Sequence, residues 1–246
     1  MRDYISASSI NLFLTCPTAY FLKYEMGMGT EKTNDSYARY GTMVHEICEK
    51  MCNGGYLFLD EAEEEYIQGY PNAGLLPSQH DGYYEQGLQG IRNAWEFFED
   101  FRIQTIGAEV KFNVKPFEDI PKYFGFIDLV YRDENGSLVV KDYKTSKVYD
   151  EKTLAKQIQP YFYAEACLAM YGELPKYFEF DFIRFGEKRT IVTDETFLKF
   201  NRVRMQGIWK QIANRNLKSN WSPFFCENFC SGRSSCPLWQ EKMGGR

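Results

Sequence analysis

Two carboxylates and a lysine lie at the ends of two predicted strands. Asp142 and Lys144 follow three apolar residues in the stretch LVVKDYKTSK, residues 138–147, and Asp128 lies in the apolar run GFIDLV, residues 125–130. Side chains alternate across a strand with a period of two, so Asp142 and Lys144 leave the same face. Charges of both signs on one face at the end of an apolar strand indicate a functional site that uses both the carboxylate and the ammonium.

The loop between these strands decides whether Asp128 joins that face. A two-residue Asn135-Gly136 turn would pair Asp128 with Tyr143 and leave Asp142 on the opposite face. A three-residue loop, residues 134–136 with a left-handed Gly136, would pair Asp128 directly with Asp142. A site that uses both acids therefore requires the three-residue loop, or a bulge that restores the same phase.

Two acids opposed across neighbouring strands repel each other unless a cation lies between them. A hard divalent cation, Mg²⁺ or Mn²⁺, suits carboxylate oxygens and keeps several of its waters. Lys144 would then position or help to deprotonate a water, or stabilise charge on an attacked phosphate. The alternative is an exposed hairpin edge that carries Lys and Asp to prevent edge-to-edge aggregation.

The composition is that of an ordinary globular protein of one domain, residues 1–246, with 44% hydrophobic and 17% aromatic residues. No apolar run reaches the length of a membrane span and the first residues lack the layout of a secretory signal, so we expect a cytoplasmic protein. The net charge of −5 conceals an asymmetry: residues 1–140 hold 11 Lys and Arg against 22 Asp and Glu, and residues 141–246 hold 18 against 12. The basic half could bind an anion, or could simply be solvated.

Hydrophobic periodicity and turn residues predict an α/β fold, in which helices flank a mixed central sheet. Helices are expected at about 6–24, 40–51, 83–102, 154–171 and 194–218, and strands at about 106–114, 123–132, 137–145, 177–185 and 189–193. Residues 53–90, punctuated by Gly and Pro and acidic at 60–65, are expected to form an insertion, most simply a solvated loop.

The G-x-I-D of residues 125–128, followed by the D-x-K of residues 142–144, resembles the PD-(D/E)XK nuclease superfamily in its RecB-like branch. Three further segments are similar to that branch: SASSINLFLTCPTAYFLKY to its opening helix, GTMVHEICEK to a segment with an active-site histidine, and AKQIQPYFYAEACLAMYG to a Gln-x3-Tyr helix. The ordered set spans residues 5–172, which makes the resemblance specific. It implies a restriction-endonuclease-like core, with a helical N-terminal part and a Cys-rich C-terminal segment.

The resemblance also implies roles for individual residues. Asp128, Asp142 and His45 would be ligands of Mg²⁺ or Mn²⁺, and Lys144 the catalytic lysine. Glu109 matches an acid on the preceding strand of these cores and joins the catalytic set. Without the resemblance, His45 would be read as a partly buried structural histidine on its helix.

Two pairs of residues fit the Gln-x3-Tyr pattern. Gln159 and Tyr163 are favoured by counting back from the helix end at Gly172, and Gln157 and Tyr161 are the alternative. Pro160 is compatible with the first pair if the helix begins there, because proline is tolerated in a first turn.

Four cysteines suggest a second metal centre. Cys226, Cys230 and Cys236 form C-x3-C-x5-C near the C-terminus, and Cys16 lies more than two hundred residues upstream. A reducing compartment favours metal ligation over disulfides. The arrangement resembles the 4Fe-4S site of the CRISPR-associated Cas-four exonucleases, although their usual spacing is C-x2-C-x5-C. Such a cluster would join residues 1–24 to 219–246 as a structural clasp; zinc or buried free thiols are the alternatives.

Two more cysteines, Cys48 and Cys52, follow His45 on one helical face. They could form a soft-metal site with it, but burial in the core is the interpretation we adopt, because cysteine is among the most buried residue types.

These observations predict a metal-dependent deoxyribonuclease, with exonuclease action on single-stranded ends suggested by the resemblance. The basic run 199–218, with Lys199, Arg202, Arg204, Lys210 and Trp209, would bind the DNA strand by charge and stacking. Recombination, helicase or CRISPR-adaptation proteins would be its partners, in phage recombination, DNA repair or CRISPR adaptation, and no membrane is involved. A non-catalytic DNA-binding or scaffold module with an iron-sulfur or zinc site is the alternative.

Overall fold

The computed structural model describes residues 3–75 and 77–243. The chain divides into two compact units. Unit 1 comprises the described parts of Met1–Asn34, Asn113–Gly125 and Leu198–Arg246, and unit 2 comprises those of Asp35–Phe112 and Phe126–Phe197. Among the described residues, no helix is both long and apolar enough to cross a membrane.

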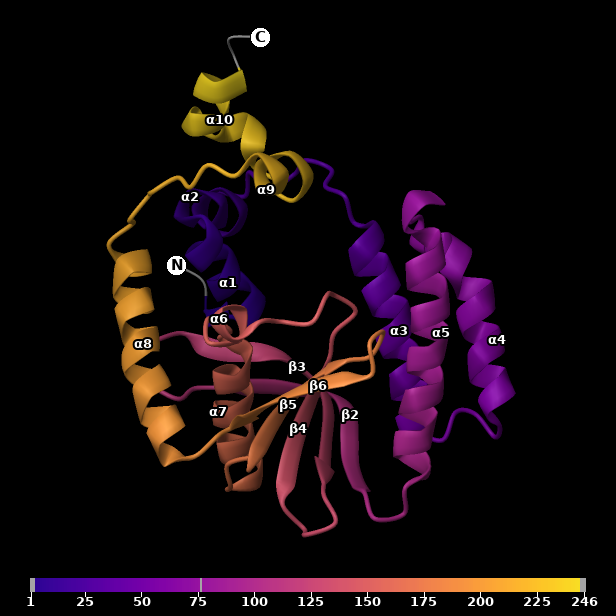
Figure 1. The fold of residues 1–246 in the computed structure, drawn as a ribbon. Helices are drawn as coiled ribbons and strands as arrows, with labels where there is room; N and C mark the ends of the chain where they lie inside the picture. Colours follow the sequence, from indigo (N-terminus) through magenta and orange to yellow (C-terminus); the bar gives the residue numbers. More distant parts are fainter. Residues whose placement is uncertain (1–2, 76, 244–246) are drawn as a thin grey trace. The chain divides into compact units, whose positions relative to one another are not determined.

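Six strands form a mixed sheet (Figure 1). The sequence predicts the mixed sheet and five of these strands, and β1 is additional. They are β1 (Tyr4–Ile5), β2 (Gln104–Val114), β3 (Lys122–Arg132), β4 (Leu138–Tyr143), β5 (Tyr177–Phe182) and β6 (Glu187–Val192). In unit 1, β1 runs parallel to the start of β3. In unit 2, β3 and β5 each pair antiparallel with their hairpin partners, β4 and β6, while β4 and β5 are parallel; β2 also pairs with β3.

The predicted helices are present, with changed boundaries. The helical elements are α1 (Ala7–Thr15), α2 (Pro17–Tyr20), η1 (Phe21–Glu25), α3 (Ser36–Cys52), α4 (Leu59–Gly69), η2 (Tyr70–Ala73), α5 (Pro77–Glu99), α6 (Glu151–Leu154), α7 (Gln159–Tyr171), α8 (Glu195–Ala213), α9 (Pro223–Asn228), η3 (Arg233–Ser235) and α10 (Pro237–Met243). Ser6 caps α1 through its side chain, as expected, and a left-handed Gly172 ends α7. The basic helix is shorter than predicted, since α8 ends at Ala213.

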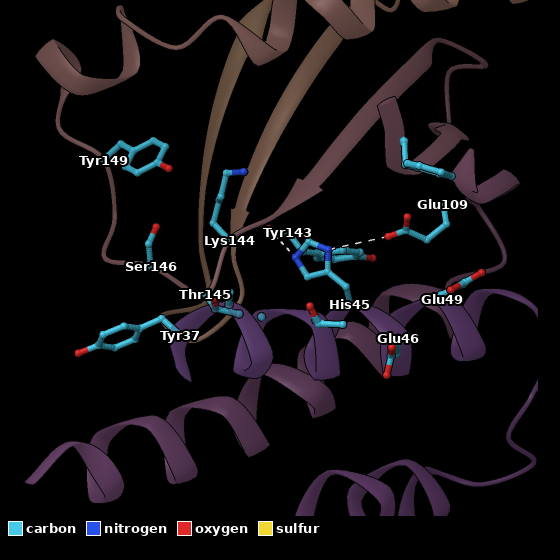
Figure 2. Close-up of a pocket in the computed structure, with 14 residues that line it drawn as sticks. Tyr37, His45, Glu46, Glu49, Glu109, Tyr143, Lys144, Thr145, Ser146 and Tyr149 are labelled. Atoms are coloured by element: carbon cyan, nitrogen blue, oxygen red, sulfur yellow. Dashed lines mark hydrogen bonds and ion pairs between the residues drawn. The ribbon is translucent and has the colours of Figure 1, made fainter. Parts of the chain in front are cut away.

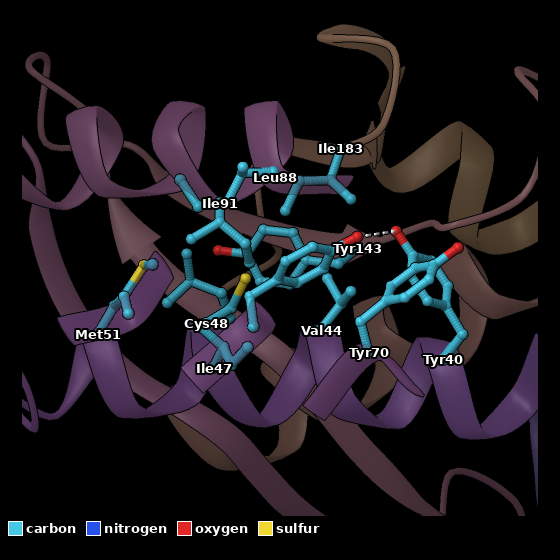
Figure 3. Close-up of a cluster of buried hydrophobic side chains, with 14 of the residues drawn as sticks. Tyr40, Val44, Ile47, Cys48, Met51, Tyr70, Leu88, Ile91, Tyr143 and Ile183 are labelled. Atoms are coloured by element: carbon cyan, nitrogen blue, oxygen red, sulfur yellow. Dashed lines mark hydrogen bonds between the residues drawn. The ribbon is translucent and has the colours of Figure 1, made fainter. Parts of the chain in front are cut away.

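The segment 53–90 differs from the expected solvated loop, and only its residue 76 lies outside the described residues. It folds into α4, η2 and the first part of α5. Its helical signal is hidden because tyrosines, rather than aliphatic residues, form its buried face. Tyr66 and Tyr70 pack edge-on against Tyr40 of α3 in the core that Figure 3 shows.

The sheet of unit 2 is covered by different helices on its two faces. Leu129, Tyr131 and Val139 pack into the core with α3 and α5. On the other face, Tyr163 of α7 packs against Phe178 of β5. Because both faces are covered, all six residues of β4 are buried, and any charge on β4 needs a partner inside the protein.

Gly87 of α5 lets two tyrosine hydroxyls reach the helix backbone. The hydroxyls of Tyr40 and Tyr66 both donate hydrogen bonds to the carbonyl oxygen of Tyr83, at 3.1 and 3.0 Å. A Cβ at Gly87 would lie 2.1 Å from each of these hydroxyl oxygens. The glycine therefore permits the contact between α5 and α3.

We expect Gly87→Ala to lower the free energy of unfolding by about 1–3 kcal/mol, the usual cost of overpacking. Gly207→Ala in α8 is the matched control, because its Cβ would meet no described atom within 4 Å. It should raise the free energy of unfolding by about 0.5–1 kcal/mol, since alanine is the better helix former. Urea denaturation measures both, and a Gly87→Ala protein as stable as the control would contradict this account of the core.

Candidate active site

The β3–β4 hairpin has the register that the site requires. The amide of Asp133 donates to the carbonyl oxygen of Ser137 at 3.0 Å, and Gly136 has a φ of +75°, so the loop is the three-residue one. Leu129 pairs with Lys141. One residue further along this register, Asp128 lies opposite Asp142, which confirms the predicted pairing of the two acids.

Asp142 is held by protein partners on both of its oxygens. Its side chain is only 1% exposed, and its Oδ2 accepts no hydrogen bond but lies 2.5 Å from the Lys144 ammonium. The side-chain amide of Gln159 donates to Oδ1. The contact with Lys144 is therefore an ion pair whose atoms are not aligned as a hydrogen bond.

The side-chain amide of Gln159, in a single orientation, makes hydrogen bonds with three neighbouring side chains. Its Oε1 accepts from Lys144 Nζ at 3.0 Å, while its Nε2 donates to Asp142 and, at 2.8 Å, to the Tyr163 hydroxyl. Burial tends to lower the pKa of Lys144, but the neighbouring carboxylates, chiefly Asp142, outweigh it and raise that pKa. Lys144 is thus a fixed ammonium beside Asp142.

The alternative pair lies elsewhere. The side chain of Gln157 donates to the carbonyl oxygen of Thr153, and Tyr161 is buried in α7. Helix α7 begins at Gln159, with Pro160 in its first turn, as the sequence suggests. The structure thus brings Gln159 and Tyr163, rather than Gln157 and Tyr161, to Asp142.

Asp128 faces a different set of groups. Its Oδ2 accepts a hydrogen bond from the amide of Tyr143 at 2.8 Å and lies 3.4 Å from His45 Nδ1. Burial and then the charge of Asp142 raise the pKa of Asp128 well above its usual range. A cation at this oxygen would remove the cost of a buried charge.

His45 presents a lone pair to two carboxylates. Its Nε2 lies 3.0 Å from the carbonyl oxygen of Tyr143, which can only accept, so Nε2 carries the proton. Burial lowers the pKa of His45, which favours the neutral ring. Nδ1 therefore turns an acceptor toward Asp128 Oδ2 and, at 4.0 Å, toward Glu109 Oε1 (Figure 2).

Glu109 reaches this position through an unusual backbone. It has a φ of +46° in the middle of β2, a left-handed conformation that costs a non-glycine residue about 1–3 kcal/mol. Burial raises the pKa of its carboxyl. The distortion has the character of a bulge that redirects a side chain at a site.

His45, Glu109 and Asp128 fit a divalent cation. Among the described residues, they form the one group of three or more His, Cys, Asp or Glu side chains whose ligand atoms all lie within 4.8 Å of one another. The two carboxylates suit Mg²⁺ or Mn²⁺, and of these two the transition metal Mn²⁺ accepts the imidazole nitrogen more readily. The sequence-based ligand set of His45, Asp128 and Asp142 is therefore only partly brought together, since Asp142 is occupied by Lys144 and Gln159.

His45, Glu109 and Lys144 line a cavity of about 780 Å³. The cavity also presents residues that the sequence did not single out, notably Tyr37, Glu49, Ser146 and Tyr149. Ser146 lies two residues beyond Lys144, so proximity in sequence was a usable signal. Tyr37 and Tyr149 carried none, because tyrosine is common throughout this chain.

The predicted DNA-binding residues lie on α8, and Lys199 and Lys210 are exposed there. Arg202 lies over the ring of Phe117, 5.6 Å from its centre, and burial lowers the pKa of Arg204. Trp209 is only 8% exposed. The expectation that Trp209 stacks on a strand is therefore wrong, because its indole belongs to the core of unit 1.

The four predicted cluster cysteines come together in unit 1, although residues 1–2 and 244–246 of the predicted clasp lie outside the described residues. Cys16, Cys226, Cys230 and Cys236 line one cavity. Burial raises the pKa of Cys230, the other three thiols add to this, and a backbone hydrogen bond at Gly232 opposes it. Cys48, by contrast, is fully buried in the core of unit 2, as expected.

A mixed sheet that presents paired carboxylates and a lysine beside a cation-binding group defines a class of proteins, the metal-dependent nucleases. The family model of the PD-(D/E)XK nuclease superfamily matches residues 4–237. The chain therefore belongs to the PD-(D/E)XK nuclease superfamily, whose members use divalent metals. The search of curated proteins found no match.

We expect Asp128→Asn and Glu109→Gln each to weaken Mn²⁺ binding at least about tenfold, because each removes a charged ligand. Glu46→Gln is the matched control: Glu46 lines the same cavity but lies outside the converging group. Isothermal titration calorimetry with Mn²⁺ measures the affinities. Equal losses in all three variants would mean that the cavity attracts cations by general charge alone.

Proposed function

We propose that the protein is a Mg²⁺- or Mn²⁺-dependent deoxyribonuclease that hydrolyses phosphodiester bonds at single-stranded DNA ends. The observation that carries the proposal is the pairing of Asp128 with Asp142 beside the Lys144 ammonium, within reach of His45 and Glu109. The resemblance to RecB-like and Cas-four exonucleases suggests end-directed cleavage, in recombination, repair or CRISPR adaptation.

His45, Glu109 and Asp128 would hold the cation, with Asp142 as a further candidate ligand from the opposite strand. The cation, when bound, lowers the pKa of a coordinated water and neutralises charge on the attacked phosphate. The imidazole is prepared for this role because its Nε2–H is fixed on the Tyr143 carbonyl, which leaves Nδ1 available.

Lys144 supplies the remaining positive charge. Its ammonium is fixed by Asp142 and Gln159, and Tyr163 fixes Gln159 in turn. A preorganised donor can orient the attacking water or stabilise the charge that develops on phosphate oxygens. Gln159 and Tyr163 thus act as positioning residues for Lys144.

Lys199, Arg202, Arg204 and Lys210 would contribute phosphate contacts from α8. Such contacts are independent of sequence and weaken with salt. Lys199 and Lys210 are exposed, so these two residues would make most of the phosphate contacts.

We further propose that Cys16, Cys226, Cys230 and Cys236 bind a 4Fe-4S cluster. The walls of their cavity include Phe225, Trp221 and Trp239, which would shield a cluster from water. Four thiolates could hold either a cluster or a single zinc ion, and the resemblance to the Cas-four exonucleases favours the cluster.

Cleavage of end-labelled single-stranded DNA with Mn²⁺ or Mg²⁺ tests the nuclease. Lys144→Met and Asp142→Asn should each reduce the rate about 100-fold or more, because one removes the ammonium and the other removes the charge that holds it. Lys147→Met is the control, since Lys147 is an exposed lysine three residues further on. Undiminished cleavage by Asp142→Asn would refute the site, and no cleavage by the wild type would favour a non-catalytic DNA-binding module.

For the cluster, we expect anaerobically purified protein to be brown and to contain about four iron atoms per chain. Cys230→Ala should lose the iron and the colour. Cys167→Ala is the control, because Cys167 is also a buried cysteine but lies in α7 of unit 2. Colourless protein with one zinc ion per chain, measured by elemental analysis, would overturn the assignment.

A further inference from the structure

The cavity has two chemically different ends, and Figure 2 shows them on either side of Lys144 and His45. At one end, beyond Glu109 of the proposed cation group, lie two further carboxylates, those of Glu46 and Glu49 from α3. A nucleic-acid strand that continued into this end would bring its phosphates against these carboxylates. Like charges repel, so this end disfavours the strand.

The opposite end carries hydroxyl and aromatic groups in place of carboxylates. Tyr37 comes from the first turn of α3, and Ser146 and Tyr149 come from the segment that follows β4. These groups carry no negative charge, so phosphates next to them escape the repulsion that the glutamates would impose. Among the described residues that line the cavity, Lys144 is the one lysine or arginine, and it separates the two ends.

Both tyrosine rings are held from behind and still line the cavity. Tyr149 lies edge-on to Phe180 and Phe182, with ring centres 5.5 and 5.0 Å apart. Tyr37 packs against Tyr83, with ring centres 5.7 Å apart. A ring fixed in this way loses little freedom when a base stacks on it, which is the usual role of aromatic side chains in strand-binding sites.

We infer that Tyr37 and Tyr149 stack on unpaired bases next to the scissile phosphate, so that the strand leaves the site away from Glu46 and Glu49. This rests on the proposed nuclease function and names the residues that would recognise its single-stranded substrate and the course of the strand. Bases inside a duplex are stacked on their neighbours and would have to be extruded first. The two tyrosines therefore select a strand with free base faces.

Steady-state cleavage of a single-stranded oligonucleotide tests the inference. Tyr37→Leu and Tyr149→Leu keep apolar packing but lack a ring, so each should raise KM roughly 5- to 100-fold with kcat nearly unchanged. Tyr37→Phe and Tyr149→Phe should restore the wild-type KM. Glu46→Gln, at the other end, should lower KM because it removes a repulsive charge.

An oligonucleotide of the same length with abasic sites next to the scissile phosphate provides a test without mutation. The wild type should bind the abasic oligonucleotide as weakly as the Leu variants bind the base-bearing one. The Leu variants should bind both oligonucleotides with the same affinity. The inference would be overturned if Tyr37→Leu and Tyr149→Leu weakened the binding of both oligonucleotides equally, or of neither.

A failure of the nuclease proposal can be told apart from a failure of the stacking site. If the wild type cleaves neither oligonucleotide, the nuclease proposal fails. Fluorescence anisotropy with Ca²⁺ in place of Mg²⁺ then still measures binding. Wild-type preference for the base-bearing strand, lost in the Leu variants, would support the stacking site, and equal binding of both strands would reject it.

Discussion

Two carboxylates lie opposite each other across β3 and β4, in strands that are covered on both faces. Burial and mutual repulsion oppose the charge on Asp128 and raise its pKa, so this pair can stay charged only where cations or donors surround it. The neighbouring elements meet this need. Helix α7 supplies Gln159 to Asp142, α3 supplies His45 to Asp128, and β2 supplies Glu109, at its left-handed residue, to the group around Asp128.

The two acids have different neighbours, and this difference makes the two sides of the site chemically distinct. Asp142 has its positive and donor partners within the protein, the Lys144 ammonium at Oδ2 and the Gln159 amide at Oδ1. Asp128 has one amide donor, and the groups that converge on it, His45 and Glu109, add further acceptors rather than donors. A lone pair facing carboxylates is unfavourable unless a cation joins them. The structure thus separates a lysine side from a cation side within one pair of residues.

The hairpin register could be predicted because it depends on local rules: a period of two along each strand and a left-handed glycine in the loop. The start of α7 was likewise indicated by Pro160. Glu109 was expected on a strand, but its left-handed backbone was not, since no residue type signals that conformation outside glycine and asparagine. Helix α4 was missed because Tyr66, which is buried through contacts with Tyr40 and Tyr84, takes the place of an aliphatic residue. Helix α5 was predicted at about 83–102 and begins earlier, at Pro77. The tyrosines of the cavity were missed because their role depends on neighbours distant in sequence.

The four cysteines address a different constraint. Unit 1 is assembled from three separate stretches of the chain, and its first and last stretches are joined covalently only through the whole of the intervening sequence. Closing so long a loop costs conformational entropy, and the proposed ligand of Cys16, Cys226, Cys230 and Cys236 would offset that cost in the folded state. Unit 2 has a continuous buried interior of its own, formed by its sheet and the tyrosine core. In this proposal the cysteines stabilise unit 1, while the charged residues of unit 2 carry the chemistry.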